Sequence, residues 1–303
     1  MNHFGLDNLG NTCYFNSCIQ TLFHCEKLVN YFIKNEISDD KPLAFQAKRL
    51  FSGMKKVQKT VAPQSFWNAF KKIHKRFNNN DQHDSQEALL LILDTLHEEL
   101  KNKDNVSIIS KLFQGIYTSK IKCNKCNNIS IKNEDFFHLL LNFPDFENPE
   151  DYDIENEYVT FNELIKYNFR DIQFKDDNLY HCDKCKTKTQ ATKSQLIKKL
   201  PEYLLIYIKR FEYEKNRFKK INDLIDIPFN INMIKYLKIN KTFTWNSSII
   251  QFGSFFGGHY INLTDIDDKI YIFDDSTVKI NEKNNKNIIK IYNQSYVYCF
   301  KSN

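Results

Sequence analysis

A cysteine near the start of the chain is the first residue whose type and setting could do chemistry. Cys13 follows a run of turn-forming and cap-forming residues, and apolar residues at helical spacing follow it: Phe15, Cys18, Ile19, Leu22 and Phe23. The pattern predicts a helix that begins at Cys13. A helix N-terminus favours the thiolate, which is the nucleophilic form of cysteine. Taken alone, Cys13 fits a small buried side chain equally well.

A histidine and an aspartate near the other end could complete a catalytic group. His259 precedes a β-rich run, 260–264, and Asp274 directly follows a second run, 269–273, with Asp-rich turn residues between them. This order predicts a hairpin whose two ends lie close together, so that Asp274 accepts an imidazole N–H of His259. A thiol protease needs this arrangement: the cysteine attacks, the histidine carries the proton, and the aspartate fixes the tautomer. Taken singly, His259 fits a loop histidine and Asp274 a turn former.

Four further cysteines form two pairs, each with turn-forming residues inside. The pairs are Cys123-x-x-Cys126 and Cys182-x-x-Cys185. Two such knuckles supply four sulfurs for a tetrahedral zinc ion, and four sulfurs leave no open position, so the predicted site is structural. Two disulfides or four unrelated thiols are the alternatives, and the lack of a signal peptide argues against disulfides. An acidic stretch between the pairs, 145–157, fits a solvated loop, and a docking patch for a basic surface is the alternative.

The elements that must position these residues differ along the chain. Helical signals dominate up to about residue 112, and the clearest predicted helix runs from Asp84 to about Leu100. Asp84 with Glu87 three residues later is typical of a capped helix start, so Asp84 fits an N-cap with no further role. From about Phe113 onward, β signals dominate, over 115–122, 203–209, 247–252, 260–264, 270–273 and 295–300. The sequence therefore predicts a helical part that faces a β part.

Composition narrows the class of protein. The chain has 303 residues, 42% hydrophobic and 15% aromatic, enough for a sizeable core. The net charge is +6, but Lys and Arg are scattered among acids, which makes nucleic-acid binding a minor option. No signal peptide and no run of eighteen apolar residues is visible. We expect an intracellular protein, cytoplasmic or nuclear, without a membrane span.

Four stretches, in this order along the chain, resemble the sequence boxes of the ubiquitin-specific proteases, a papain-like family of deubiquitinases. They are the cysteine box 5–17, the glutamine–aspartate box 82–88, the core strand 204–211, and a histidine box made of 257–260 and 273–276. The four stretches, from residue 5 to residue 276, span nearly the whole chain. Their combination is highly specific, although no single box is.

The resemblance implies a fold, an activity and a partner. The fold is α+β, papain-like, with a helical thumb at about 1–112, zinc-tipped β fingers at about 113–135 and 170–200, and a β palm over the remainder. We expect one catalytic domain over residues 1–303, acting as a monomer on ubiquitin and ubiquitinated proteins. The expected reaction is hydrolysis of the isopeptide or peptide bond after the C-terminal glycine of ubiquitin, with zinc as the structural metal and no catalytic cofactor.

The resemblance also implies roles near the nucleophile. The side-chain amide of Asn8 and the backbone N–H of Cys13 are the expected oxyanion donors. Asn8 alone fits a turn asparagine, and Asn11 is an alternative candidate for the donor. Asp274, as the residue directly after the last aromatic of its strand, is expected to orient His259. Asp275 points to the opposite face of the strand, so we expect an auxiliary role for it.

Further residues are expected to bind the substrate. Asp84 would meet the basic tail of ubiquitin, and Gln82 and Tyr260 would contact the substrate. Gly257 and Gly258 would let two backbones approach closely, since the expected substrate ends in Gly-Gly. A flexible loop before a strand is the alternative reading of the two glycines.

Two departures and two alternative functions remain. Many family members have a second histidine where this chain has Gln251, and a phenylalanine where it has Ala88. A non-catalytic ubiquitin-binding protein of the same fold is the main alternative, and the presence of Cys13, His259 and Asp274 favours the enzyme. Cleavage of a different ubiquitin-like modifier is the third hypothesis.

Overall fold

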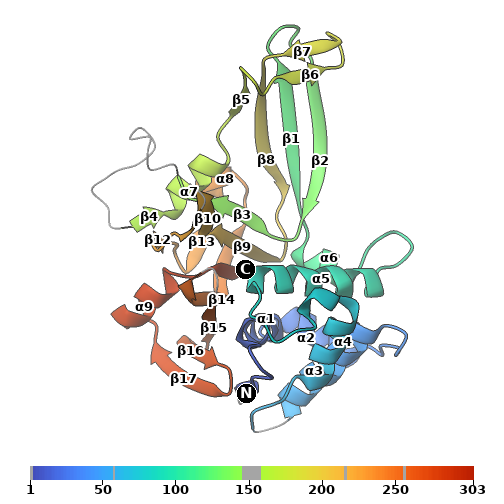
Figure 1. Ribbon diagram of the computed structural model, residues 1–303, viewed down its shortest axis with the longest axis vertical. Helices are drawn as coiled ribbons and strands as arrows, with labels where there is room; N and C mark the ends of the chain where they lie inside the picture. The colour runs from blue at the N-terminus through green and yellow to red at the C-terminus, as the bar shows by residue number, and fades with distance from the viewer. Residues whose placement is uncertain (1–2, 57–58, 145–157, 215–216, 255–256) are drawn as a thin grey trace.

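Helices and strands separate into three parts in space. The computed structural model describes residues 3–56, 59–144, 158–214, 217–254 and 257–303, so the acidic stretch 145–157 lies outside the described residues. Figure 1 shows a helical part, a broad sheet beside it and a long narrow projection above both. The α+β class that the sequence predicts is confirmed.

The helical part comes from the first third of the chain. Its elements are α1 (Cys13–Phe23), α2 (Glu26–Lys34), α3 (Pro42–Lys56), α4 (Gln64–Ile73), the 3₁₀ turn η1 (Lys75–Phe77), α5 (Ser85–Leu100) and α6 (Ile108–Phe113). Every residue of α1 is buried, because α1 packs between α5 and the broad sheet. The predicted helix after Asp84 is confirmed as α5, with Asp84 as its N-cap. Cys13 is therefore placed at the centre of the molecule by the helix that it begins.

The broad sheet holds the second half of the predicted catalytic group. Its strand order is β17-β16-β15-β14-β18-β9-β3, with β13 paired to β14. The bounds are β3 (Leu139–Asn142), β9 (Tyr203–Lys209), β13 (Asn230–Asn232), β14 (Thr242–Ser254), β15 (Gly257–Ile266), β16 (Lys269–Asp274), β17 (Thr277–Glu282) and β18 (Val297–Ser302). The hairpin predicted around His259 and Asp274 is confirmed as β15 and β16, paired antiparallel.

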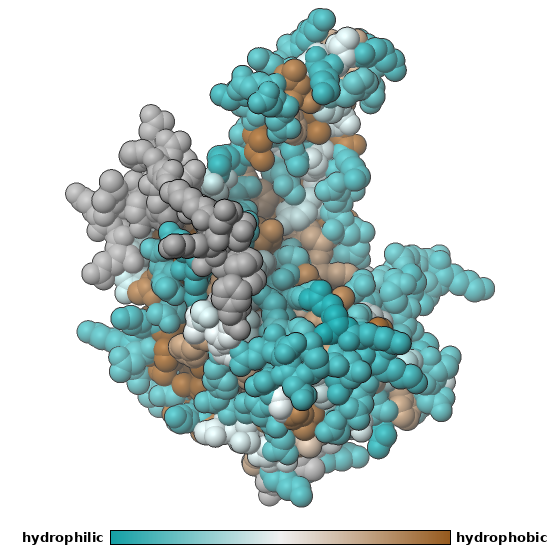
Figure 2. Space-filling view, in the orientation of Figure 1, coloured by the Kyte–Doolittle hydropathy of each residue, from teal (hydrophilic) through white to brown (hydrophobic). Residues whose placement is uncertain are grey.

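The projection is a thin sheet with a metal-type cluster at its tip. Its strand order is β2-β1-β8-β5, from β1 (Gly115–Cys123), β2 (Ile129–Phe136), β5 (Ile172–Phe174) and β8 (Ala191–Lys199). A small hairpin, β6 (Tyr180–Cys182) with β7 (Thr187–Thr189), closes the tip. Strand β2 is exposed except at its last residue, and Figure 2 shows hydrophobic residues among hydrophilic ones on the projection. Such a sheet buries little apolar surface, so its tip needs stabilisation from another source.

Smaller elements flank the broad sheet. They are α7 (Phe161–Asn168), α8 (Ile234–Leu237), α9 (Lys286–Tyr292), the parallel pair β4 (Tyr158–Thr160) and β12 (Leu224–Asp226), and the hairpin β10 (Phe211–Glu214) with β11 (Arg217–Lys220). One hydrophobic cluster runs from the helices into the sheet, through Tyr203, Ile249, Tyr260 and Cys299. The helical part and the sheet therefore share a core. Within the described residues, no helix has the length and apolar character needed to cross a membrane.

Candidate active site

Cys13 is the first residue of α1 and is almost completely buried, with 2% of its surface exposed. Burial raises the pKa of its thiol, a backbone hydrogen bond at Tyr260 lowers it, and the Asp275 carboxylate raises it further. The net direction is upward. The backbone hydrogen bonds at the helix start, from Cys13 and Tyr14, lower the pKa of the thiol, but burial outweighs them. A base is needed to take the proton.

The predicted base and its partner meet at the end of the β15–β16 hairpin. His259 Nε2 lies 2.6 Å from Asp274 Oδ1. The pair forms because Asn262 faces Phe273 in the ladder, which brings the start of β15 back to the end of β16. Both side chains are about half exposed. With Nε2 on the carboxylate, Nδ1 is the ring nitrogen left for the thiol. Among the described residues, no hydrogen bond yet joins Cys13 to His259.

Asp275 does something different from Asp274. Its Oδ2 accepts from Asn8 Nδ2 at 2.7 Å, and its Oδ1 accepts from Asn16 Nδ2 at 2.8 Å. Its backbone has a φ of 48°, in the left-handed region, and its carbonyl accepts from the N–H of Leu6. Asp275 therefore ties the segment before α1 to the turn after β16. Sequence reasoning missed Asn16, because α1 carries three other buried polar residues, Ser17, Gln20 and Thr21, and nothing in the sequence marks Asn16 among them.

Asn8 is held on both sides of its amide. Its Oδ1 accepts from the backbone N–H of Gly10 at 3.0 Å and of Thr12 at 3.1 Å, which shapes the turn before α1. Its Nδ2 donates to Asp275. Because an amide nitrogen carries two N–H bonds, this contact uses one of them and fixes the plane of the other. The turn role that the sequence left open is therefore present, and it does not exclude a donor role.

The residues expected to bind substrate line one cavity of about 230 Å³ between the helical part and the sheet. From the helical side come Arg76, Gln82, His83, Asp84 and Glu87, and from the sheet side come Phe211, Gln251, Ser254, Gly257, Gly258 and Tyr260. All five predicted contacts, Gln82, Asp84, Gly257, Gly258 and Tyr260, are among them. Gly258 is followed directly by His259, so the cavity leads to the predicted base.

Two contacts explain residue types in this cavity. Gln82 Oε1 accepts from the N–H of Gly258 at 2.6 Å, a hydrogen bond across the cavity from the helical side to the sheet side. A Cβ added at Gly258 would lie 2.1 Å from Gln251 Nε2 and 2.2 Å from the carbonyl oxygen of Phe252. Only glycine fits at position 258. A Cβ at Gly257 would meet only Gln82 Oε1, at 3.6 Å, so the space before Gly257 is more open.

Asp84 is both a helix cap and a member of a tyrosine network. Its Oδ1 accepts from the N–H of Gln86 at 2.7 Å, and its Oδ2 accepts from the hydroxyl of Tyr296. The Tyr296 hydroxyl lies 3.0 Å from that of Tyr207. Burial raises the pKa of Asp84, and the Tyr296 hydrogen bond lowers it. Sequence reasoning missed both tyrosines, because nothing local shows that Tyr207 on β9 and Tyr296, just before β18, reach the start of α5.

The four predicted metal ligands lie together at the tip of the projection. Cys123 Sγ is 3.9 Å from Cys185 Sγ, Cys126 Sγ is 3.6 Å from Cys182 Sγ, and all four atoms lie within 4.8 Å of one another. Tetrahedral zinc, with Zn–S bonds of about 2.3 Å, places its sulfurs roughly 3.8 Å apart. A disulfide needs about 2.05 Å, and all eight cysteines are free. The cluster can hold a metal ion, and its geometry fits zinc.

The two knuckles repeat the same backbone bond. Asn127 N–H donates to the carbonyl of Cys123, and Lys186 N–H donates to the carbonyl of Cys182, at 2.9 and 2.8 Å. Asn127 and Lys186 both have positive φ, at 58° and 53°. Each pair is therefore a tight turn of the same form, which aims two thiols to one side.

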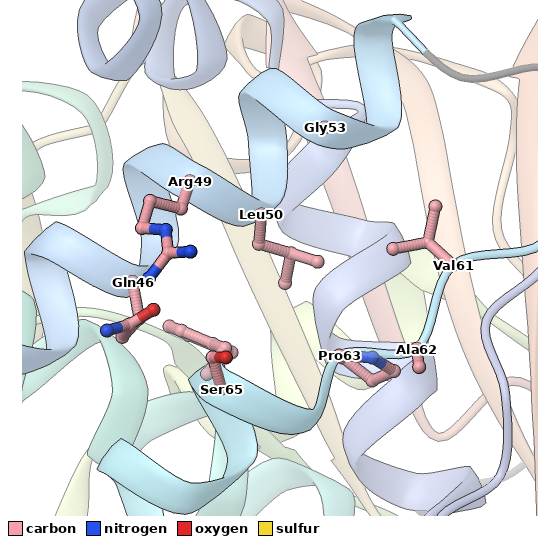
Figure 3. A pocket seen from close by; sticks show the side chains of 9 residues that line it. Gln46, Arg49, Leu50, Gly53, Val61, Ala62, Pro63 and Ser65 are labelled. Carbon is pink, nitrogen blue, oxygen red and sulfur yellow. The ribbon is translucent and has the colours of Figure 1, made fainter.

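A second cavity, of about 180 Å³, lies between α3 and the start of α4 (Figure 3). Figure 3 shows Gln46 and Arg49 on α3 opposite Ser65, with Leu50 and Val61 closing the space. Its lining contains no cysteine, histidine or acidic residue. The first cavity differs in that His83, Asp84 and Glu87 are part of its lining.

Comparisons with known proteins agree with this geometry. The family model described as ubiquitin carboxyl-terminal hydrolase matches residues 4–300. Ubiquitin carboxyl-terminal hydrolase 4 of Arabidopsis thaliana is 27% identical over 325 residues, covering 93% of this chain and 86% of that protein. Ubiquitin carboxyl-terminal hydrolase Usp2 of Drosophila melanogaster is 28% identical over 298 residues, covering 86% of this chain and 30% of that protein.

Solved structures share the fold. The SAGA DUB module of Ubp8, Sgf11, Sus1 and Sgf73 bound to monoubiquitin contains a chain with a TM-score of 0.81 and 23% identity, matched over 100% of this chain and 69% of that one. The Ubp8 module bound to ubiquitin aldehyde gives a TM-score of 0.80 and 22% identity, over 100% of this chain and 70% of that one. These matches confirm the expected fold class.

Proposed function

The chain belongs to the ubiquitin carboxyl-terminal hydrolase family and is a cysteine-type deubiquitinase, and from this premise we propose that Cys13, His259 and Asp274 carry its reaction. The observation that supports this most is the His259–Asp274 pair at 2.6 Å, since both sequence neighbours of His259, Gly258 and Tyr260, line the cavity of the predicted substrate contacts. Cys13 lies against Tyr260, the residue next to His259.

The proposed reaction begins with proton transfer. His259 Nδ1 takes the proton of the Cys13 thiol, which burial otherwise keeps neutral, and the thiolate attacks the carbonyl carbon of the terminal glycine. Asp274 stabilises the imidazolium through Nε2. The imidazolium then protonates the leaving amine, the thioester remains, and a water activated by the same imidazole hydrolyses it. Free thiol and a ubiquitin carboxylate result.

The oxyanion is proposed to meet two N–H donors. One is the backbone N–H of Cys13, at the start of α1. The other is the second N–H of Asn8, whose amide plane is fixed by Asp275 on one side and by the turn before α1 on the other. Asp275 then serves catalysis through Asn8, while Asp274 serves it through His259. This division supports the auxiliary role expected for Asp275.

The proposed substrate tail lies in the cavity between the two parts. Asp84 would receive a basic side chain of the tail, and Gln82 and Tyr260 would contact its backbone. At Gly258 no side chain fits, so a tail that ends in Gly-Gly can approach the wall closely. Ubiquitin and ubiquitinated proteins are the proposed partners.

We propose structural zinc as the metal of the four-cysteine cluster, held by Cys123, Cys126, Cys182 and Cys185. Four thiolates around one ion leave no position for a substrate, and the ion would supply stability to a sheet that buries little of its own surface. Elemental analysis of the purified protein should give one zinc per chain. Active protein without zinc would overturn this assignment.

We propose that residues 1–303 form one catalytic domain, with the thumb at about 1–112, the fingers at about 113–135 and 170–200 and the palm over the remainder. The core shared by helices and sheet supports a single domain. We further propose that the chain acts as a monomer. We also propose that it lies in the cytoplasm or nucleus, because eight free cysteines suit a reducing compartment. Light scattering and microscopy of a tagged chain test these two statements.

One experiment tests the function. The purified chain is given a panel of modifiers, ubiquitin and ubiquitin-like proteins, each labelled with a fluorophore at its C-terminus. Release of fluorophore from ubiquitin, lost in Cys13→Ala, is the expected result. Binding without release in the wild-type chain would favour the non-catalytic alternative, and release from another modifier alone would change the substrate.

A further inference from the structure

Strand β14 keeps its partner β15 to its end, but its pairing with β18 stops at Ile249. It pairs with β18 over Phe243–Ile249 and with β15 over Ser247–Ser254. The carbonyl of Ile249 still accepts from Tyr296 N–H, at 2.8 Å. Carbonyls two residues apart on a strand point the same way, so those of Gln251 and Gly253 face the side that β18 has left. Backbone acceptors in this position need a partner.

Lys220, at the end of β11, supplies that partner. Its Nζ donates to the carbonyl of Gln251 at 2.6 Å, to the carbonyl of Gly253 at 3.2 Å, and to the side-chain oxygen Oε1 of Gln251. Three acceptors match the three N–H bonds of an ammonium group. The side chain also lies over the ring of Phe211, which lines the substrate cavity. Lys220 therefore satisfies the carbonyls of β14 that lie beyond the end of its pairing with β18.

The contacts of Lys220 lead to the wall of the cavity. Gln251 is 5% exposed, and its Nε2 donates to the carbonyl of Ser254 at 3.0 Å. The same amide packs against Gly258, where a Cβ would come within 2.1 Å of Nε2. Gly258 is the residue whose N–H reaches Gln82 across the cavity. A shift of Gln251 would therefore move the backbone that the tail of the substrate has to pass.

The partly buried position of Lys220 disfavours its charged form. Burial, and then the nearby charge of Arg210, lower the pKa of Lys220 to about 8. A lysine that only needed solvent would point away from this site, as Lys219 does, which is exposed on the same strand. The oxygens of β14 compensate for the lost hydration.

We propose that Lys220 is a positioning residue, which holds the Gln251–Gly258 wall of the cavity in the form that accepts the tail of the substrate. This rests on the proposed function of that cavity. Lys220 is not among the residues that line the cavity, and it acts through Gln251. Since Asp274 holds His259 independently, the expected loss concerns binding of the tail more than turnover.

The test compares Lys220→Met, which keeps length without charge, with Lys220→Arg and with the matched control Lys219→Met. Ubiquitin labelled at its C-terminus is the substrate, and KM, kcat and Tm are measured for the full chain. For Lys220→Met we expect KM to rise about five- to tenfold, as for loss of charge-assisted hydrogen bonds, with kcat within about twofold. Lys220→Arg should recover most of the loss, and Lys219→Met should equal the wild type.

A second substrate separates this role from a general loss of structure. A short peptide with the sequence of the ubiquitin tail contacts only the cavity, so its kcat/KM should fall by the same factor in Lys220→Met. If KM for Lys220→Met equals that for Lys219→Met, or if kcat and Tm fall together with no change in KM, the positioning role is wrong. A wild-type chain that releases no fluorophore from ubiquitin would instead overturn the proposed function.

Discussion

The tip of the projection and the candidate active site both depend on cysteines, but the groups around those cysteines differ. At the tip, four thiols lie within 4.8 Å of one another. At the candidate active site, Cys13 is buried at the start of α1 beside Tyr260 and Asp275, and His259 pairs with Asp274. Neighbouring groups, and not the cysteine itself, decide whether a thiol serves as a metal ligand or as a nucleophile.

The two regions also differ in how they are assembled. Each half of the tip is a turn of a few residues, closed by a bond such as Asn127 N–H to the carbonyl of Cys123. The candidate active site depends on contacts such as that of Asn8 with Asp275, which are 267 residues apart. Disruption of the tip should therefore leave the catalytic chemistry intact. Substitutions in the catalytic group should leave the tip folded.

The largest expected effect is at the nucleophile. Cys13→Ala should lower kcat by at least about 10⁴-fold, because the attacking atom is gone. Zinc content and ubiquitin affinity should be unchanged, as measured by elemental analysis and calorimetry. Cys18→Ala is the control: Cys18 is fully buried, donates to the carbonyl of Ser85, and should keep kcat within about threefold. Turnover that survives Cys13→Ala would show that Cys13 is not the nucleophile, and the contrast between the two regions would then fail.

The next effect separates two adjacent aspartates. Asp274→Asn should lower kcat by about 10²- to 10⁴-fold with KM within about threefold, because the imidazolium loses its partner. Asp275→Asn should cost less, about tenfold in kcat, since Asp275 acts through Asn8. Stopped-flow or steady-state assays with labelled ubiquitin decide between them. A larger loss of kcat at Asp275 would reverse the assignment.

The third prediction breaks the tip instead. Cys182→Ser, or removal of metal by a chelator, should lower Tm by at least about 5 °C, because metal binding contributes to folding. Hydrolysis of a short tail peptide, which does not reach the tip, should stay within about threefold of the wild type. Calorimetry and the peptide assay are the two measurements. Equal losses in both would mean that the tip and the cavity are not independent.

The sequence could predict the features that depend on local patterns, and it could not predict those that depend on long-range contacts. The spacing of Cys123 and Cys126, and the hairpin that joins His259 to Asp274, are local patterns, and the residue types alone predict both. The network of Asp84 with Tyr296 and Tyr207 is not predictable in this way, because three separate elements meet there and no local pattern records it. The net direction of the pKa of the Cys13 thiol is not predictable from the sequence, for a related reason. A helix start is visible in sequence, whereas burial between α5 and the sheet is a property of the whole fold.

The fourth prediction concerns capture of the substrate. Asp84→Asn keeps a good N-cap for α5 and removes only the charge, so Tm should change little. KM for ubiquitin should rise about tenfold, with kcat nearly unchanged, because a charge-assisted contact with a basic tail is lost. An unchanged KM would leave Asp84 as a helix cap alone.

The smallest expected effect is a pH dependence at the same carboxylate. Burial raises the pKa of Asp84, and the hydrogen bond from Tyr296 lowers it, so Tyr296→Phe should raise that pKa further. The tail binds only the ionised carboxylate, so KM should rise as the pH falls through this pKa. In Tyr296→Phe the rise should begin at a higher pH, while KM at about pH 8 stays within about threefold of the wild type. Tyr207→Phe, one hydroxyl further from Asp84, should shift the curve less. KM–pH curves that coincide for the three proteins would show that the tyrosine network supports packing at the cavity and not the charge of Asp84.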